Sequence, residues 1–252
     1  METEKFPILK YTVQLYYAPI KENAALYLDH NPPIQIASGV LVKYASKFLL
    51  ITCKHVFDGI KPEDVIILTR AGFAVRLPND IKFINDENNS IDLAVITLKG
   101  HRLKELKSCY SFLPHKNIGF KHNFDEELYY MLFGFVNSKT TLNDFEFYAQ
   151  PFGYLTNIRS YKNFEKMGFS YNNNITLEYN RRKQSDLNDE VRQIGYNDLK
   201  GMSGGGVWLS VEGKKPNTYE YILVAIMIEQ RISRGFIIAT KIDFIEVNNT
   251  AI

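Results

Sequence analysis

Ser203 lies in the stretch GMSGGGVWL (201–209), where four of the first six residues are glycine. Because glycine loses the most backbone freedom on ordering, the cluster indicates either a flexible turn with an incidental serine or a backbone shape that side chains would prevent. A serine hydroxyl becomes a nucleophile when a base takes its proton and backbone N–H groups face the oxyanion that forms on the attacked carbonyl. Gly201 allows its own N–H and that of Ser203 to converge as an oxyanion hole, while Gly204 and Gly205 would admit a substrate closely. Under this second interpretation, Ser203 needs a base and a carboxylate.

His55 is the histidine best placed to be the base. It stands at the end of the apolar run FLLITCK (48–54), and catalytic groups are often presented where a strand ends. Taken alone, a histidine in this position more often has a structural role in the core or at the strand end. The other four histidines stand in polar surroundings and are expected at the surface: His30, His101, His115 and His122.

Asp92 is the candidate for the carboxylate. It opens the apolar stretch DLAVITL (92–98), so its side chain is expected to be partly buried, where an unpaired charge is costly. The Nδ1–H group of His55 would supply its partner. Asp86 and Glu87 are expected to lie in a surface loop.

Short β-branched or aromatic runs bounded by turn residues dominate the rest of the chain and predict strands. These runs are 11–20, 37–57, 64–69, 92–98, 129–136 and 221–228. YASK (44–47) is expected to be a hairpin connection, and HRLKELKSCYSFL (101–113) a short helix or a crossover. The polar segments 171–176 and 180–190 are expected to be exposed loops. Many short strands with few helices indicate an all-β barrel or sandwich.

The overall composition excludes several classes of protein. A net charge of +2 argues against a dedicated nucleic-acid binder, and the basic residues at 181–183 are followed closely by acidic ones. No apolar run approaches the roughly 18 to 20 residues that would span a bilayer. The first ten residues lack the pattern of a signal peptide, and two cysteines are too few for a disulfide framework, so a cytoplasmic location is expected.

The chain order His, Asp, Ser, with these local contexts, resembles that of the chymotrypsin/trypsin-like serine peptidases. SGVLV (38–42) and ITCKHV (51–56) are similar to the strand before the family's histidine and to the histidine segment itself. IDLAVITL (91–98) resembles its aspartate strand, and GMSGGGVW (201–208) its Gly-Asp-Ser-Gly-Gly-Pro motif. The similarity extends over about residues 35–245.

The resemblance implies two six-stranded antiparallel β-barrels with few short helices and the active site between them. Residues 1–115 would form the barrel that carries His55 and Asp92, and residues 116–252 the barrel that carries Ser203. It also implies roles: Ser203 as nucleophile, His55 as general base and then acid, and Asp92 as the group that orients the imidazole. The backbone N–H groups of Gly201 and Ser203 would form the oxyanion hole.

The resemblance further implies where a polypeptide substrate would bind. The stretch 225–230 would pair with the substrate backbone as an added strand, through Ile226, Met227, Ile228 and Glu229. The floor of the primary pocket would lie near Asn197 and Asp198, with Lys200 and Glu229 flanking the cleft. An aspartate at 198 would favour Arg or Lys at the cleavage position, unless Asp198 only caps its loop.

The sequence departs from the family pattern at several positions. Met202 replaces an aspartate that, in secreted members, pairs with an amino terminus freed by cleavage, so activation by that route is not expected. Gly206 replaces a proline, which would loosen the following strand. Met227 or Ile228 replaces a serine that supports the triad aspartate.

The leading hypothesis is therefore a stand-alone intracellular serine endopeptidase that works through an acyl-enzyme on Ser203. By resemblance, such an enzyme would act as an effector in bacterial stress or phage defence, with a partner protein supplying its substrate or activation. Cys53 is expected to pack in the first barrel, and neither it nor Cys109 has a metal-binding spacing, so no metal and no cofactor are predicted. The alternative is a catalytically silent protease-like module that binds a partner peptide.

Overall fold

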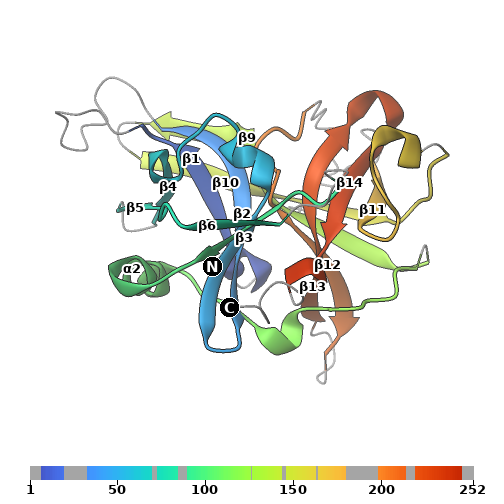
Figure 1. Cartoon of the computed structure of the whole chain (residues 1–252), viewed down its shortest axis with the longest axis horizontal. Coiled ribbons are helices and arrows are strands. Elements are labelled where there is room, and N and C mark those ends of the chain that lie inside the picture. The colour runs from blue at the N-terminus through green and yellow to red at the C-terminus, as the bar shows by residue number, and fades with distance from the viewer. Residues whose placement is uncertain are drawn as a thin grey trace.

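A computed structural model gives the fold of the chain (Figure 1). It describes residues 7–19, 33–69, 73–84, 90–125, 127–143, 146–162, 164–179, 198–213 and 219–245. Within these ranges, the structure describes only the backbone of 138–143, 146–150 and Ile232.

Two curled, mainly antiparallel sheets make up the described part of the chain (Figure 1). The first contains β1 (Thr12–Tyr17), β2 (Ile34–Tyr44), β3 (Lys47–Thr52), β4 (Val65–Leu68), β5 (Ala74–Arg76), β6 (Ile81–Ile84), β7 (Leu93–Thr97) and β8 (Leu113–Pro114). The second contains β9 (Tyr129–Asn143), β10 (Glu146–Asn157), β11 (Asn174–Glu178), β12 (Gly206–Glu212), β13 (Tyr219–Arg231) and β14 (Phe236–Lys241). The double half-barrel confirms the predicted chymotrypsin-like fold class.

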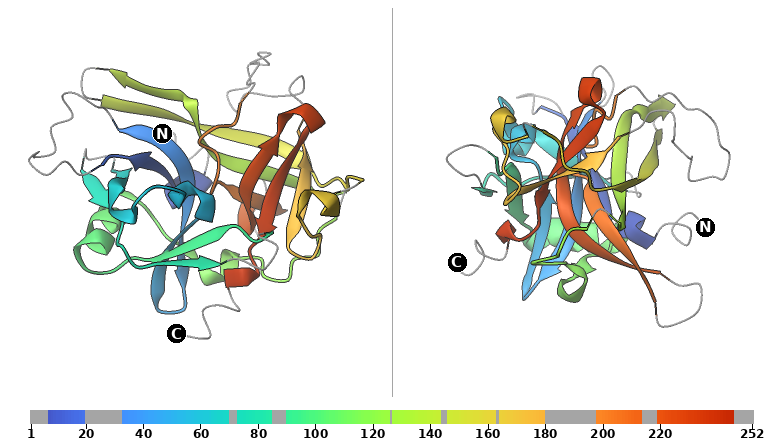
Figure 2. Two further views of the ribbon diagram at one scale, coloured as in Figure 1. Left: turned by 45° about the horizontal axis from the view of Figure 1, so that its top comes forward. Right: turned by 90° about the vertical axis from the view of Figure 1, so that its right-hand side faces the viewer.

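The strands follow the order β5-β4-β1-β2-β3-β7-β6 in the first sheet, with the short β8 pairing parallel to β2. This sheet thus exceeds the six strands of the family pattern by the short β8 and one further strand. The second sheet has six strands, in the order β10-β9-β12-β13-β14-β11. The long β9–β10 hairpin extends beyond the second sheet toward the first, and β9 contacts both β1 and β2 (Figure 2).

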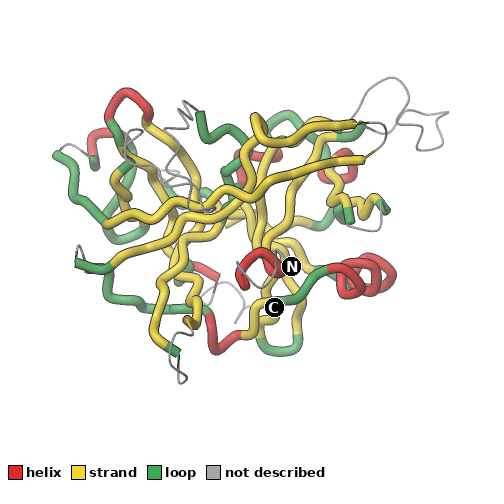
Figure 3. Tube along the Cα trace, turned by 180° about the vertical axis from the view of Figure 1, so that it is seen from behind, coloured by secondary structure: helices red, strands yellow, loops and turns green. Residues whose placement is uncertain are grey.

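Strands far outweigh helices in the described residues (Figure 3). The α-helix there is α2 (Gly100–Cys109). It begins one residue before the start of the predicted segment 101–113 and ends four residues before the end of that segment. The 3₁₀ turns are η1 (Pro7–Tyr11), η2 (Lys54–Phe57), η3 (Pro62–Asp64), η4 (His115–Asn117), η5 (Glu165–Met167) and η7 (Ile232–Arg234). None of the helices in this part of the chain has the length and apolarity needed to cross a membrane.

Each of the six predicted strand runs contains a strand, and the hairpin at YASK is confirmed by the pairing of Tyr44 with Lys47. The prediction of an exposed loop over 171–176 is wrong for its second half. β11 begins at Asn174, whose side chain is buried and donates to the backbone carbonyl of Ser90 at 2.8 Å. A buried, paired amide made a polar stretch behave as a strand. The other predicted loop, 180–190, lies outside the described residues.

Trp208 anchors the second sheet to the core, as a packing residue two positions after the last glycine of the cluster. It is fully buried and packs with Phe133, Leu223 and Ile226. A β-bulge between Val207 and Trp208 interrupts the register with β13.

Gly206 packs directly under that indole. A Cβ placed on Gly206 would lie 2.4 Å from Nε1 and 2.7 Å from Cε2 of Trp208. The glycine at the family's proline position is therefore matched to a buried tryptophan two residues later.

Gly206→Ala should lower the free energy of unfolding by about 1–3 kcal/mol, the usual cost of overpacking a close-packed core. Chemical denaturation measures this change, with Ser210→Ala on the less buried part of β12 as the matched control. Equal stability of the two variants would contradict the packing account.

Candidate active site

His55 and Asp92 are brought together by the pairing of two strands. β3 and β7 run antiparallel, with Thr52 opposite Ala94. The residues just after β3 and just before β7 therefore emerge at the same end of the sheet. His55 follows in the 3₁₀ turn η2, and Asp92 directly precedes β7.

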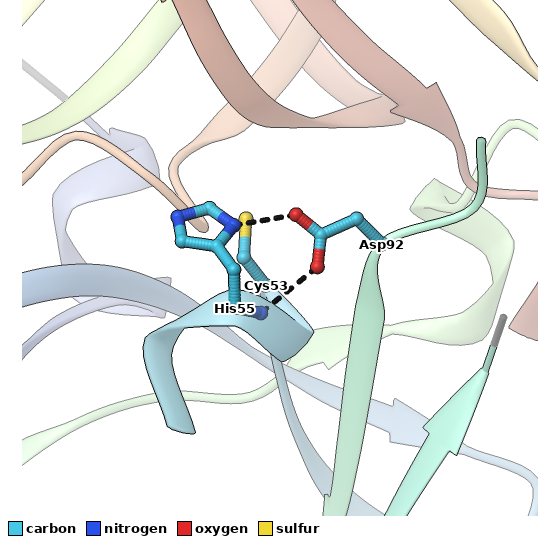
Figure 4. Close-up of side chains that lie close together, drawn as sticks. All are labelled: Cys53, His55 and Asp92. Atoms are coloured by element: carbon cyan, nitrogen blue, oxygen red, sulfur yellow. Dashed lines mark hydrogen bonds and ion pairs between the residues drawn. The ribbon is translucent and has the colours of Figure 1, made fainter. Parts of the chain in front are cut away.

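Asp92 binds His55 through both carboxylate oxygens (Figure 4). Oδ2 lies 2.5 Å from Nδ1 of the imidazole, and Oδ1 accepts the backbone N–H of His55 at 2.9 Å. An ionised carboxylate only accepts hydrogen bonds, so the contact selects the tautomer with the proton on Nδ1. The second ring nitrogen, Nε2, points away from Asp92 (Figure 4) and makes no hydrogen bond to another described residue.

The surroundings of His55 favour its charged form overall. Burial by itself lowers the pKa of the imidazole, but the hydrogen bond and negative charge of Asp92 raise it, as do the charges of Asp58 and Glu229. The net effect is a pKa above the ordinary value of 6.5. The His55 side chain remains 41% exposed, so Nε2 can be reached from solvent.

Cys53 lies beneath this pair. Its thiol is fully buried and donates to the carbonyl of Met227 at 3.0 Å. Burial, followed by the charge of Asp92, raises the pKa of the thiol well above its usual value, although a hydrogen bond from Gly204 opposes the shift.

The Sγ, imidazole and carboxylate atoms of Cys53, His55 and Asp92 lie within 4.8 Å of one another, a set that a metal such as zinc could use. Metal binding would require loss of the thiol proton and of the Nδ1–Asp92 hydrogen bond. The arrangement favours the hydrogen-bonded pair, and the predicted absence of a metal site stays a prediction.

Ser203 sits in a turn whose backbone donors divide into two groups. The N–H groups of Met202, Gly204 and Gly205 donate to backbone carbonyls at 2.7–2.9 Å. Those of Gly201 and Ser203 have no acceptor among the described residues. The two unused donors are the pair expected to form an oxyanion hole.

The carbonyl partners of this turn explain where those two donors point. The Lys200 carbonyl accepts the N–H of Asn137 at 2.8 Å, and the Met202 carbonyl accepts that of Gly205 at 2.7 Å. In a trans peptide the N–H and C=O point in opposite directions. The N–H groups of Gly201 and Ser203 therefore point away from Asn137 and Gly205.

Gly204 and Gly205 are crowded by the protein itself, which corrects the expectation that they serve close substrate approach. A Cβ on Gly204 would lie 2.1 Å from the carbonyl oxygen of Ser38 and 2.2 Å from Oγ1 of Thr52. A Cβ on Gly205 would lie 2.8 Å from two backbone carbonyl oxygens. Gly204 allows the turn to pack against the strand that leads to His55, and Gly205 allows it to pack against β9.

The hydroxyl of Ser203 is oriented toward the carbonyl of Ile228, at 3.5 Å, and within the described residues it makes no hydrogen bond to His55. Residues close to Ser203 and to His55 in the sequence nevertheless donate to the same backbone carbonyl. The Met227 carbonyl accepts both the Cys53 thiol, two residues before His55, and the N–H of Gly204, directly after Ser203.

The prediction that Ile226 and Met227 pair with a substrate backbone is wrong. Ile226 pairs with Gly206 of β12 on one side and Thr240 of β14 on the other. Met227 pairs with β14, and its N–H and C=O are taken by the glycine turn. Beyond Met227 the strand has left β12, so Ile228 and Glu229 border an open edge in the described part of the sheet.

The predicted pocket residues lie before the glycine turn. Asp198 is exposed, and its carboxylate accepts the N–H of Lys200 at 2.9 Å, which is the capping role. Lys200 is exposed as well. Leu199 between them is buried, and its N–H donates to Oε1 of Gln230 at 2.8 Å. Asn197 lies outside the described residues.

A cleft of about 550 Å³ adjoins the His–Asp pair. His55 and Asp92 line it beside the first sheet, while Ile228 and Glu229 of β13 and Phe169 of the segment before β11 also line it. The cleft thus borders the open edge of β13 at Ile228 and Glu229, and Ser203 is not among its lining residues.

Sequence reasoning missed two polar residues of β2 that reach the glycine turn. Gln35 and Ser38 are buried, and both donate toward the carbonyl of Gly201. Their signal was the presence of polar side chains in the otherwise apolar strand IQIASGVLV (34–42).

No model of a known protein family matches the chain, and no curated protein sequence matches it either. Solved structures do. A protease of Vibrio cholerae, VesB, superposes with a TM-score of 0.55 at 13% identity, over 96% of this chain and 63% of the VesB chain. The protease of tobacco vein mottling virus superposes with a TM-score of 0.49 at 11% identity, over 94% of this chain and 79% of the viral chain. This chain spans less than two thirds of VesB, and at such low identity the similarity concerns the fold: the protein has the fold of the trypsin-like peptidases.

Proposed function

We propose that the protein is a serine endopeptidase that hydrolyses peptide bonds through an acyl-enzyme on Ser203. The observation that carries the proposal is a combination of two features. The N–H groups of Gly201 and Ser203 have no acceptor among the described residues, and the tautomer of the His55 imidazole is set by Asp92. Free donors that face the site are what a developing oxyanion needs.

Each group has one task in the reaction. His55 Nε2 takes the proton from Ser203 as Oγ attacks the scissile carbonyl, and later gives it to the leaving amine. Asp92 holds the Nδ1–H and stabilises the imidazolium. Attack requires Ser203 to turn from the Ile228 carbonyl toward His55, which leaves that carbonyl free to accept a substrate N–H.

The substrate is proposed to be a polypeptide that adds a strand to the open edge of β13 at Ile228 and Glu229. Its side chains would extend along the cleft beside His55. A cytoplasmic location stays a prediction from the N-terminal sequence and the cysteine content, and a partner protein and a role in bacterial stress or phage defence stay predictions from the family resemblance.

The nucleophile is assigned to Ser203 and not to the nearby thiol. Cys53 is fully buried, and its raised pKa keeps it protonated at neutral pH. Reactive cysteines are partly exposed thiolates in electropositive surroundings. Ser203 is half-buried. Its own N–H and that of Gly201 are the two donors that have no acceptor among the described residues.

A fluorophosphonate probe should label Ser203, because Oγ attacks phosphorus, fluoride leaves and His55 takes the proton. Mass spectrometry locates the adduct. Ser203→Ala and His55→Ala should abolish labelling and lower hydrolysis of fluorescein-labelled casein by about 10⁴-fold or more. Ser210→Ala is the matched control and should leave both unchanged.

Absence of labelling in the wild type, with no casein hydrolysis, would contradict the proposal. If the protein then still bound peptides, the silent binding module would be the better description.

The pH dependence of kcat/KM should report the raised pKa of His55. Catalysis needs the neutral imidazole, so the rate should rise with pH with a midpoint above 6.5. Asp92→Asn should lower that midpoint, and it should lower kcat by up to about 10⁴-fold because the tautomer is no longer fixed. Asp58→Asn, which removes a weaker and exposed charge, is the control and should lower the midpoint only slightly.

The same shift predicts a stability change of known sign. A pKa raised by folding means that the pair stabilises the fold fully below pH 6.5, and that this contribution is lost as the pH rises through the folded pKa of His55. NMR titration of the His55 ring measures the midpoint directly. A midpoint below 6.5 in the wild type would contradict the electrostatic account.

A further inference from the structure

The peptide group between Gly201 and Met202 is held by side chains from the opposite sheet. The Gly201 carbonyl accepts the Ser38 hydroxyl at 2.9 Å and the Gln35 side-chain amide at 3.4 Å. Gln35 is 2% exposed and Ser38 is fully buried. Both come from β2 of the first sheet, whereas Gly201 lies in the turn that precedes β12 of the second sheet.

The same two side chains also bind β9. The backbone N–H of Phe135 donates to Oγ of Ser38 at 2.9 Å, and the Gln35 amide donates to the Phe135 carbonyl at 3.0 Å. Gln35 and Ser38 therefore connect three pieces of chain: β2, β9 and the glycine turn. We call this pair the Gln35–Ser38 clamp.

The clamp is packed too closely for solvent to replace it. A Cβ on Gly201 would lie 2.8 Å from Nε2 of Gln35, and a Cβ on Gly134 would lie 3.0 Å from Oγ of Ser38 and 3.1 Å from Sδ of Met202. Polar groups buried this way cost free energy unless they are paired, and here they are paired with the turn.

Gly201 is the residue that most needs such support. It has a φ of +94°, a left-handed conformation that glycine adopts and leaves easily. The peptide before Gly201 carries the Gly201 N–H, which has no acceptor among the described residues. The peptide after it carries the Gly201 carbonyl, which Gln35 and Ser38 bind. Asn137 holds the peptide before Gly201, and Gln35 and Ser38 hold the peptide after it, so rotation about Gly201 would change the orientation of the two donors relative to each other.

We propose that Gln35 and Ser38 are positioning residues that hold the Gly201 and Ser203 N–H groups in the competent orientation before substrate binds. The inference rests on the proposed peptidase function. Met202 is buried and uncharged, so the turn is stabilised by hydrogen bonds from β2 where an ion pair at that residue is chemically impossible. The site is thereby formed without an activating cleavage.

Loss of the clamp should lower kcat and leave KM nearly unchanged. An oxyanion donor acts on the transition state, and a turn that is competent only part of the time reduces the rate by that fraction. Removal of a full donor lowers kcat by about 10²–10³-fold in other enzymes, so loosening should cost about 10- to 100-fold.

The test uses the variants Ser38→Ala and Gln35→Met, which remove the donors with little change in volume and keep the backbone bonds of β2. The substrate is a fluorogenic peptide copied from a site that the wild type cleaves in casein. The expected result is a 10- to 100-fold lower kcat, a KM within about threefold, and a matching loss of affinity for the corresponding peptide aldehyde, whose adduct carries an oxyanion.

Thr12→Val is the matched control. Its hydroxyl is buried in the first sheet and donates to the carbonyl of Ile8 at 3.1 Å, away from the glycine turn. It should lose stability to a similar extent and retain kcat.

Hydrogen exchange of the 199–205 segment supplies a readout that does not depend on activity. Exchange should quicken in the clamp variants and stay unchanged in Thr12→Val. Clamp variants with a kcat within twofold of the wild type would overturn the inference while the peptidase assignment stands. A wild type that neither cleaves casein nor takes up the fluorophosphonate would overturn the proposed function, and the inference with it.

Discussion

The backbone of Ser38 fixes the spacing between the two halves of the site. Its N–H donates to the carbonyl of Ser203 at 2.8 Å, and its carbonyl accepts the hydroxyl of Thr52 at 2.7 Å. Thr52 ends the strand that leads to His55, so one residue joins the turn of the proposed nucleophile, Ser203, to the segment of the proposed base, His55. Gly204 must be glycine because a Cβ there would lie 2.1 Å from the Ser38 carbonyl oxygen. The glycine cluster is thus explained first by contact between the two sheets.

A second atom, the backbone carbonyl oxygen of Met227, also connects the segment of His55 to the turn of Ser203. The carbonyl of Met227 accepts the Cys53 thiol and the N–H of Gly204. Together with Ser38, it holds the segments of His55 and Ser203 against β13. Asp92 then needs only to orient the imidazole, through its contacts with Nδ1 and the backbone N–H of His55. The two segments are thus held by hydrogen bonds to the backbone of Ser38 and Met227, and the imidazole is oriented by a single side-chain pair.

The residues that sequence could predict are those with a local signature. Apolar alternation predicted the strands, and an aspartate at the head of an apolar strand indicated the partner of a histidine at the end of another. Tertiary pairing decided the rest. Asn174 became part of β11 because its buried amide has partners, and Ile226 and Met227 are closed to substrate because both strand edges are used. Gln35 and Ser38 act on a carbonyl more than 160 residues away in sequence, which no local pattern encodes.

The most direct test of the central claim is a crystal structure of the protein with a peptide boronate bound. The account predicts a covalent bond from Ser203 Oγ to boron, with one boronate oxygen about 3 Å from both the Gly201 and Ser203 nitrogens. It also predicts that the Gly201 carbonyl remains on Ser38 and that His55 remains on Asp92. A boronate bound elsewhere, or a Gly201 peptide that has rotated to meet it, would contradict a preformed site.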